Sequence, residues 1–362
     1  MRILVAMSGG VDSSVAAARL IEEGHDISGA YMKNWINEEN IAGNCPWQQD
    51  IEDARSVAEH LGIEFHVVNM MKEYRERVVH YLLEGYQNGV TPNPDVMCNR
   101  EMKFGVFLDY ALENGFEAVA TGHYARVRDN EDGTKDVLCG MDPNKNQTYF
   151  LALLNQNQAS RAIFPIGDLL KSDLRKSALD LGLPNAKKKD SQGICFIGEI
   201  KMSDFLSNYV PDNPGDIVNL KGDVLGKHRG LHLYTLGQRK GIGVPSNVYK
   251  EAFVVVDKKI KENELVVGFD CKETAGLYAS RCTINGLSFV NRVPNLNEKI
   301  YAQARYRTPS VAADLKIKSF EDGKAELLFD EPQRALTPGQ VCAFYSDDVL
   351  MGGGFFESID YS

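Results

Sequence analysis

The sequence predicts an α/β fold: a doubly wound parallel sheet at the N-terminus, a small middle module and a C-terminal β-barrel. Strand-like and helix-like segments alternate in the first half, and a glycine-rich loop joins the first strand to the first helix. After about residue 205, turn signals and short alternating runs replace helical periodicity. Strands that alternate with helices pair in parallel, with helices on both faces. We therefore expect domains at 1–205, 206–275 and 276–362.

The individual elements follow from periodicity. Residues 2–7 form an apolar run that predicts a strand, and 11–23 show helical spacing that stops at Gly24. The same reasoning predicts strands at 26–32, 63–68 and 118–121, and helices at 50–61, 71–86 and 103–112. In the tail, residues 336–341 and 351–356 predict a hairpin with a bulge or a close backbone approach.

Charge restricts the partners of this chain. Its 362 residues carry 40 Lys+Arg and 50 Asp+Glu, a formal net charge of −10, which argues against a non-specific nucleic-acid coat. Two stretches depart from this average, because 224–250 has no acid and 299–318 has only Asp314. Tyr234 and Tyr306 lie in these stretches and could stack on unpaired bases.

The seven cysteines are an odd number with no C-x-x-C pair. This pattern argues against a zinc ribbon, a thioredoxin-type pair and a ferredoxin-type cluster. The apolar run at the N-terminus is too short for a signal peptide, and no stretch approaches the ~20 apolar residues of a membrane span. We therefore expect a cytoplasmic protein with no membrane partner, in which unpaired thiols are either core residues or chemically used.

The strongest motif joins the first predicted strand to the first predicted helix. It consists of Ala6, Met7, Ser8, Gly9, Gly10, Val11, Asp12 and Ser13. Two glycines let the backbone fold tightly around an anion, and the N–H groups of a helix start point at it. Asp12 fits beside a phosphate when Mg²⁺ lies between them. Since the Walker A lysine is missing, the motif indicates a metal-bound pyrophosphate site of another kind.

Two cysteines have surroundings that favour reactivity. Cys98 follows the Pro-broken segment 91–97, with Cys98 or Asn99 expected near a helix cap, where the helix dipole, Arg100 and Lys103 would favour a thiolate. Asp95 is close enough in sequence to exchange a proton. Cys195 follows three lysines and a Ser-Gln-Gly segment, and it is either a reactive thiol or the core-facing residue of a strand.

Together these segments resemble a known family. The loop at 6–13 is similar to that of the ATP pyrophosphatase (PP-loop) superfamily, whose Rossmann-like HUP domain binds ATP and Mg²⁺. This resemblance implies adenylation, with Met32 beside the adenine and Gly122 at the same sheet edge. With 93–99 and 191–196 added, the chain looks like the tRNA-specific 2-thiouridylase family. Further matching stretches lie at 121–124, 146–151, 236–241, 304–307 and 336–340, so the resemblance covers nearly the full length.

The resemblance implies thiolation of the wobble uridine, position 34, in tRNA(Lys), tRNA(Glu) and tRNA(Gln). ATP would adenylate the C2 oxygen, and sulfur would arrive as a persulfide on Cys195 from a cysteine desulfurase or a sulfur-relay protein. Either that persulfide attacks C2 and Cys98 resolves it, or Cys98 releases sulfide that attacks. Both routes leave a transient Cys98–Cys195 disulfide, and Asp95 is the candidate acid or base.

The same resemblance implies which residues touch the RNA. They are Asn93, Pro94 and Asp95 at the target base, and Lys145, Asn146, Gln147, Arg305 and Tyr306 elsewhere on the tRNA. The family more often carries an acidic residue at the position of Asn146.

Three rival functions remain for comparison. An amide-forming ATP pyrophosphatase has no use for two reactive cysteines, and a 4-thiouridine synthetase lacks the Asn-Pro-Asp-x-x-Cys-Asn loop and the C-terminal β half. A non-catalytic tRNA- or nucleotide-binding protein would leave Asp12, Cys98 and Cys195 unexplained. Release of AMP in the presence of tRNA distinguishes the last of these from an enzyme.

Overall fold

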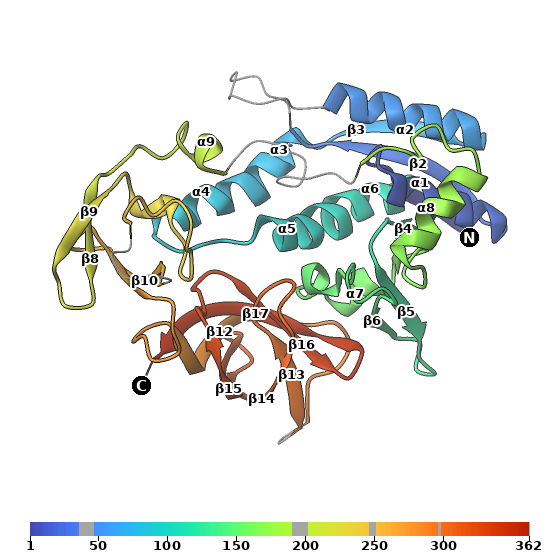
Figure 1. Cartoon of the computed structure of the whole chain (residues 1–362). Helices are drawn as coiled ribbons and strands as arrows, with labels where there is room; N and C mark the ends of the chain where they lie inside the picture. The colour runs from blue at the N-terminus through green and yellow to red at the C-terminus, as the bar shows by residue number, and fades with distance from the viewer. Residues whose placement is uncertain (36–46, 190–201, 246–250, 296–297, 362) are drawn as a thin grey trace.

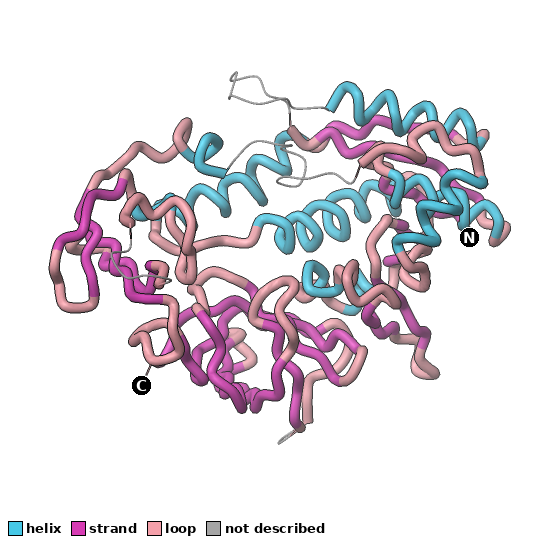
Figure 2. Tube along the Cα trace, in the orientation of Figure 1, coloured by secondary structure: helices cyan, strands magenta, loops and turns pink. Residues whose placement is uncertain are grey.

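The fold is taken from a computed structural model, which describes residues 1–35, 47–189, 202–245, 251–295 and 298–361. Helices gather around one sheet in the N-terminal half, and strands dominate the rest of the chain (Figures 1 and 2). The predicted fold class is therefore confirmed. The division of the chain at 205 and 275 stays a prediction, because the first half also contributes strands to the C-terminal sheet.

The N-terminal sheet is parallel throughout. Its strands lie in the order β3-β2-β1-β4-β7. They are β1 (Arg2–Ala6), β2 (Asp26–Lys33), β3 (Glu64–Asn69), β4 (Ala118–Ala120) and β7 (Ala162–Ile163). The order reverses between β1 and β4, and open α/β sheets bind ligands at the carboxyl ends of strands at such a point.

Helices cover both faces of this sheet (Figure 1). On one face lie α1 (Val11–Glu22), α2 (Trp47–Leu61) and α8 (Lys171–Asp180), which share a core with Ile3 and Val5. On the other face, Leu4 and Ala6 pack with a second set of helices. That set contains α3 (Met71–Tyr74), the π-helical η1 (Arg75–Val79), α4 (His80–Gln87), α5 (Pro94–Met97), the π-helical η2 (Cys98–Val106) and α6 (Phe107–Glu113).

One predicted helix start is wrong. The sequence placed a cap near Cys98 or Asn99 and a helix over 103–112, whereas the helical path begins at Pro94. The reason is local: the Asn93 side chain accepts a hydrogen bond from Val96 N at 3.2 Å, and Pro94 occupies the first helical position. Cys98 therefore lies one turn inside the helix, and Gly105 forms a kink between η2 and α6.

The C-terminal strands close into a ring of six. The order is β12-β15-β14-β13-β16-β17, and β17 pairs back with β12. The bounds are β12 (Tyr278–Phe289), β13 (Lys299–Gln303), β14 (Val311–Ser319), β15 (Lys324–Arg334), β16 (Val341–Ser346) and β17 (Val349–Asp360). The tail hairpin and its bulge are confirmed. The close approach is also present, because a side chain at Gly352 would collide with Ser288 O.

A second, smaller sheet has the order β10-β11-β8-β9. Its strands are β8 (Gly215–Asn219), β9 (Val224–His228), β10 (Phe253–Lys259) and β11 (Glu264–Phe269). From the first half, β5 (Ala125–Asp129) and β6 (Lys135–Cys139) extend the barrel sheet through β17. The remaining short elements are η3 (Thr148–Leu151), α7 (Gln156–Ala159), α9 (Met202–Leu206) and η4 (Leu231–Leu233).

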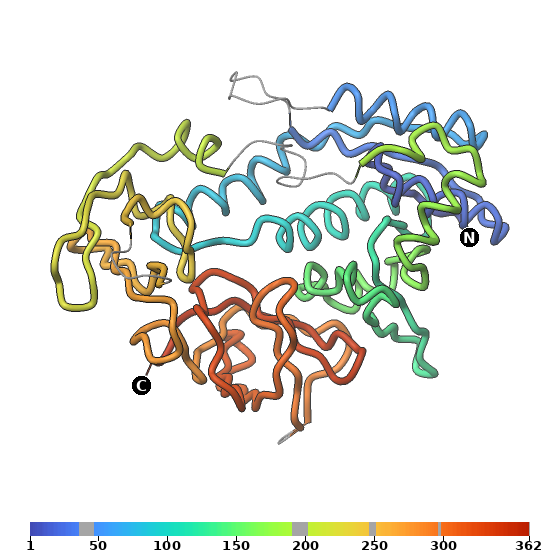
Figure 3. Tube along the Cα trace, in the orientation of Figure 1, coloured from blue at the N-terminus to red at the C-terminus, as the bar shows by residue number. Residues whose placement is uncertain are grey.

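The connection between α4 and α5 lies where the three parts of the chain meet (Figure 3). Thr91 N donates to Pro338 O at 3.2 Å, and Lys258 Nζ donates to Gly89 O at 3.3 Å. Within the described ranges, no helix is long and apolar enough to cross a membrane.

Candidate active site

The loop after β1 folds around its own hydroxyl groups. Ser8 N donates to Ser13 Oγ at 3.2 Å, Ser13 Oγ donates to Gly10 O at 3.0 Å, and Ser14 Oγ donates to the same carbonyl at 2.9 Å. The first-turn N–H groups of α1 at Val11, Asp12 and Ser13 have no acceptor within the helix, as at every helix start. The hydroxyl bonds fix the loop, which therefore presents backbone N–H donors at the end of β1, and these suit an anion.

Two glycines let neighbouring segments pack closely against this loop. Gly9 has φ +73°, and a side chain there would collide with Asp50 O at the start of α2. Gly122, directly beyond β4, would place a Cβ 2.7 Å from Ser13 N. Both positions require glycine because the chain passes so close to the loop. These contacts join the loop after β1 to the end of β4, the two strands between which the strand order reverses.

Asp12 is held by two residues that the sequence analysis missed. Lys171 Nζ lies 2.6 Å from Asp12 Oδ1, and Tyr124 Oη donates to the same oxygen at 3.2 Å. Lys171 starts α8, 159 residues after Asp12. Tyr124 lies in the matching stretch 121–124 but had no assigned role, and no local pattern marks Lys171, so only the folded chain reveals their contact with Asp12. Lys171 adds a positive charge beside the loop.

The segment after α8 also supports the loop. Asn185 Nδ2 donates to Gly9 O at 3.0 Å and to Ser14 Oγ at 2.9 Å. Lys188 Nζ contacts Asp50 Oδ1 at 2.7 Å and Asp53 Oδ2 at 2.6 Å. Desolvation works against the ammonium of Lys188, but these two carboxylates outweigh it and raise its pKa. Lys188 therefore fastens the segment after α8 to α2 as a cation.

Cys98 is completely buried, with no exposed side-chain surface. It belongs to the same core cluster as Ala6 and Met32, which end β1 and β2. Arg100, expected to favour the Cys98 thiolate, bonds Glu101 Oε1 through Nε at 2.7 Å. Its charge is therefore largely compensated. Asp95 lies in the first turn of α5, one turn before Cys98.

The segment before Cys98 is held from far along the chain. Gln340 Nε2 donates to Thr91 O at 2.8 Å and to Pro92 O at 3.1 Å, and Asn93 N donates to Tyr81 Oη at 3.1 Å. Thr91 Oγ1 also lies 3.3 Å from Thr235 Oγ1. The expected target-base residues Asn93, Pro94 and Asp95 therefore lie on a segment that both C-terminal parts position.

The expected tRNA-contact residues have structural partners of their own. Asn146 Oδ1 accepts from Gly140 N and Thr148 Oγ1, and Gln147 Oε1 accepts from Tyr124 N at 3.0 Å. Lys145 N donates to Asp142 O at 3.0 Å. These bonds fix the 145–147 turn against the start of β5 and the end of β6, and its contact with tRNA stays a prediction.

Arg305 and Tyr306 differ in their surroundings. The guanidinium of Arg305 donates to Leu236 O at 2.9 Å, Ala335 O at 2.6 Å and Thr337 Oγ1 at 2.8 Å. Burial lowers the pKa of Arg305. Its hydrogen bonds join the barrel to the chain between η4 and β10. Tyr306 packs against Phe150 with ring centroids 4.4 Å apart, and Phe150 O accepts from Asn99 Nδ2. Phe150 therefore links Tyr306 to Asn99, the residue after Cys98.

Met32 is buried at the end of β2. Cys195, the proposed persulfide carrier, lies outside the described residues, as does Cys45. Of the other cysteines, Cys282 and Cys342 are buried. Desolvation raises the pKa of the Cys282 thiol to about 12, and it raises the pKa values of Cys342 and Cys139 as well. These three thiols stay protonated near neutral pH, so they are poor nucleophiles.

One expectation about the spare cysteines is wrong. Unpaired thiols without a chemical role were expected to be core residues, but Cys271 is exposed, because it lies in the turn after β11 with Sγ 3.1 Å from Thr274 Oγ1. Among the residues that the structure describes, no three His, Cys, Asp or Glu side chains converge as metal ligands.

The two basic stretches are less positive than their composition suggests. In 224–250, acids from outside the stretch pair with Lys227, Arg229 and Arg239. In 299–318, Lys299 contacts Asp314 at 3.0 Å and Asp330 at 2.6 Å, and Lys318 contacts Glu326. The pairing follows the strand register, since Lys299 lies opposite Asp314. Cross-strand acids therefore offset much of the charge that was expected to attract RNA.

Comparison with known proteins finds similarity along nearly the whole chain. Family profiles described as "tRNA methyl transferase HUP domain", "tRNA methyl transferase PRC-barrel domain" and "Aminomethyltransferase beta-barrel domain" match residues 1–199, 203–269 and 279–356. A protein named tRNA-specific 2-thiouridylase MnmA from Akkermansia muciniphila is 58% identical over 99% of both chains. Its namesake from Alkaliphilus oremlandii is 47% identical over 99% of this chain and 97% of that one.

One solved structure shows a more limited likeness. It is described as a 4-thiouridine synthetase–RNA complex with bound ATP, with 18% identity and a TM-score of 0.37 over 55% of this chain and 45% of that one.

Proposed function

The chain belongs to the tRNA-specific 2-thiouridylase family, and we propose that it uses ATP to replace the C2 oxygen of uridine 34 by sulfur in tRNA(Lys), tRNA(Glu) and tRNA(Gln). One conjunction carries this proposal: the anion-binding loop at 8–13 follows β1, and the buried Cys98 shares a core cluster with Ala6, the last residue of that strand. Sulfur transfer is favoured over the methyl transfer in two profile descriptions, because methyl transfer uses neither feature.

The residues present fit a bound ATP. Glycine at positions 9 and 122 lets Asp50 and the start of α1 pack closely around the loop, whose first-turn N–H groups would point at bound phosphates. The hydroxyls of Ser8 and Ser13 lie 3.3 Å apart within this loop. Lys171 is held beside the loop by its contact with Asp12. Mg²⁺ held by Asp12 and the phosphates would offset the negative charge of the departing pyrophosphate. The resemblance to the family implies that Met32 lies beside the adenine and that Gly122 lies at the same edge of the sheet, and we extend that placement to this chain.

The first step forms a bond between the uridine C2 oxygen and the α-phosphorus of ATP, and breaks the bond from that phosphorus to pyrophosphate. Backbone N–H groups of the loop stabilise the leaving group because they point at the charge that develops on it. Asn93 and Asp95 would hold the extruded base, and Asp95 would take or give its proton.

The second step delivers sulfur from a persulfide on Cys195. In one route its terminal sulfur attacks C2, AMP leaves, and the Cys98 thiolate cleaves the S–S bond. In the other, Cys98 first releases sulfide, which then attacks C2. Both end with 2-thiouridine, AMP and a Cys98–Cys195 disulfide, so a thiol reductant must return two electrons before the next cycle. The persulfide donor would be a cysteine desulfurase or a relay protein, in a reducing cytoplasm.

The test is reconstitution with tRNA, ATP, Mg²⁺ and a persulfide donor, followed by mass spectrometry of the nucleosides. We expect 2-thiouridine at position 34 and one AMP per sulfur transferred. Cys195→Ser should bind ATP and tRNA yet form no 2-thiouridine, and thiolation by this variant would remove Cys195 from the reaction. Asp12→Ala should lose AMP formation.

Cys98→Ser separates the two routes. If the persulfide attacks first, this variant accumulates a covalent adduct between tRNA and protein, because nothing cleaves the S–S bond. If Cys98 acts first, the variant keeps its persulfide and forms no adduct. Denaturing gel electrophoresis with and without a thiol reductant distinguishes the two outcomes.

A further inference from the structure

A cavity of about 440 Å³ lies beyond the carboxyl end of β2. Trp35 lines it from the segment after β2, Arg75, Val79 and Leu83 from the helix over 71–87, and Tyr209 from the chain after α9. None of its lining residues belongs to the loop at 6–13 or to the segment 89–99. The proposed reaction therefore assigns it no role.

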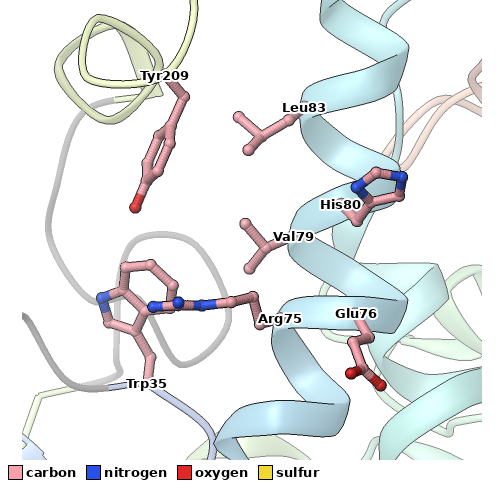
Figure 4. A pocket seen from close by; sticks show the side chains of 7 residues that line it. All are labelled: Trp35, Arg75, Glu76, Val79, His80, Leu83 and Tyr209. Carbon is pink, nitrogen blue, oxygen red and sulfur yellow. The ribbon is translucent and has the colours of Figure 1, made fainter.

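The cavity combines surfaces that suit an unpaired base. Figure 4 shows Tyr209 extending toward Trp35, with Val79 and Leu83 projecting from the helix into the space between them, and Glu76 and His80 also belong to the lining. Trp35 and Val79 are buried, Leu83 and Tyr209 are partly buried, and Arg75 is exposed. An aromatic ring, an aliphatic wall and an exposed guanidinium are the elements with which proteins bind splayed-out nucleotides.

Polar atoms without partners occur in the lining residue Trp35 and in Asn34, which precedes it in the chain and is not itself part of the lining. Among the described residues, seven buried side-chain nitrogen or oxygen atoms have no hydrogen-bond partner, and three of them are Asn34 Nδ2, Asn34 Oδ1 and Trp35 Nε1. Asn34 is only 2% exposed. A buried amide with both its donor and its acceptor unmet is unusual and calls for a ligand. The adjacent donor and acceptor of an amide match those on the edge of a base.

We propose that this cavity is a subsite for a second unpaired base of the RNA substrate, a neighbour of the modified uridine in the same loop. Tyr209 contacts the face of that base, Asn34 bonds its edge, and Arg75 contacts its phosphate. The inference rests on the proposed function, because tRNA is the substrate there. ATP fits less well, since its phosphate loop and Met32 contribute nothing to the lining.

The test uses anticodon stem–loop RNAs in which 2-aminopurine replaces one loop base at a time, bound to the full chain without ATP. Stacking on an aromatic side chain quenches 2-aminopurine fluorescence. We expect quenching at one position other than 34, and its loss in Tyr209→Leu. The matched control is Tyr278→Leu, a partly buried tyrosine of β12, which should quench like the wild type.

Two further variants test the polar contacts. Asn34→Leu should weaken RNA binding about tenfold, whereas Asn88→Leu, at the exposed end of α4, should leave it unchanged. Arg75→Gln should reduce the slope of log affinity against log salt by about 1. If Asn34→Leu does not fold, Tyr209→Leu and Arg75→Gln still decide, because they change side chains that are not buried.

Several outcomes overturn the proposal. Wild-type quenching at no position other than 34 does so, and so does quenching that persists in Tyr209→Leu with unchanged RNA affinity in Asn34→Leu. If the variants weaken ATP binding in the absence of RNA and leave RNA binding intact, the cavity holds adenine instead. Failure of the proposed function looks different: wild-type protein would quench the RNA yet form no 2-thiouridine.

Discussion

The loop after β1 and the segment before Cys98 reach a defined geometry in different ways. Hydroxyl bonds within the loop span two to five residues, as between Gly10 and Ser8 or between Ser8 and Ser13. The segment before Cys98 depends on Gln340, 249 residues away from Thr91, and on Thr235, 144 residues away. A short motif thus specifies the backbone path of the loop, which Asn185 and Lys171 then support from far along the chain, whereas the path of the segment before Cys98 depends on the docked C-terminal parts.

The largest loss of activity is expected from a substitution where the loop after β1 packs against α2. Gly9→Ala adds a methyl group that collides with Asp50 O, on a backbone with φ +73°, so we expect AMP formation to fall at least a hundredfold. Gly24→Ala is the matched control, because Gly24 has φ +81° and nothing within 4 Å. Both variants carry the same backbone strain, so equal losses in an AMP-release assay would rule out the steric explanation.

The next effect concerns the charge beside the loop. Lys171→Met removes the cation 2.6 Å from Asp12, so the Asp12 carboxylate would repel the phosphates of ATP. We expect kcat/KM for ATP to fall about thirtyfold, the size of a lost charge-assisted hydrogen bond. Lys176→Met, an exposed lysine of the same helix, should behave like the wild type. Unchanged ATP kinetics in Lys171→Met would show that Tyr124 alone suffices.

The contrast also explains what the sequence could predict. The strand, loop and helix at 2–22 follow from local spacing, and the glycines mark the tight turn. The partners of Asp12 and Thr91 lie more than a hundred residues away, so no window of sequence contains both members of either pair. The basic stretches misled for a related reason: composition counts Lys299 as a free cation, but strand register places Asp314 opposite it.

A smaller effect is expected at the distant support of Cys98. Gln340→Leu removes the bonds to Thr91 O and Pro92 O, which leaves the segment before Cys98 less ordered. We expect thiolation to fall about tenfold while ATP affinity stays unchanged. Gln333→Leu, whose amide donates only to nearby Glu331 O, serves as the control. An equal fall in ATP affinity would contradict the independence of the two regions.

The smallest expected effect is on stability. Lys258 Nζ donates to Gly89 O at the start of the segment before Cys98, and desolvation lowers the pKa of Lys258 to about 8. The ordinary lysine value is 10.5, so between pH 8 and 10.5 the unfolded chain binds more protons than the folded one. The free energy of unfolding must therefore rise with pH across that window. Because the side chain is partly exposed, we expect a rise of about 1–2 kcal/mol, below the full value of the shift.

Urea denaturation at several pH values measures this rise. Lys258→Met should lose it, whereas Lys261→Met, an exposed lysine in the next turn, should keep it. If docking of the β8–β11 sheet controls the Cys98 segment, the rate of thiolation should also rise with pH in the wild type and lose this rise in Lys258→Met. If Lys258→Met keeps the full pH dependence of stability, the contact with Gly89 is made by a lysine that still titrates normally. The middle sheet would then add no pH-dependent energy to this segment, and the distant support of Cys98 would rest on the barrel alone.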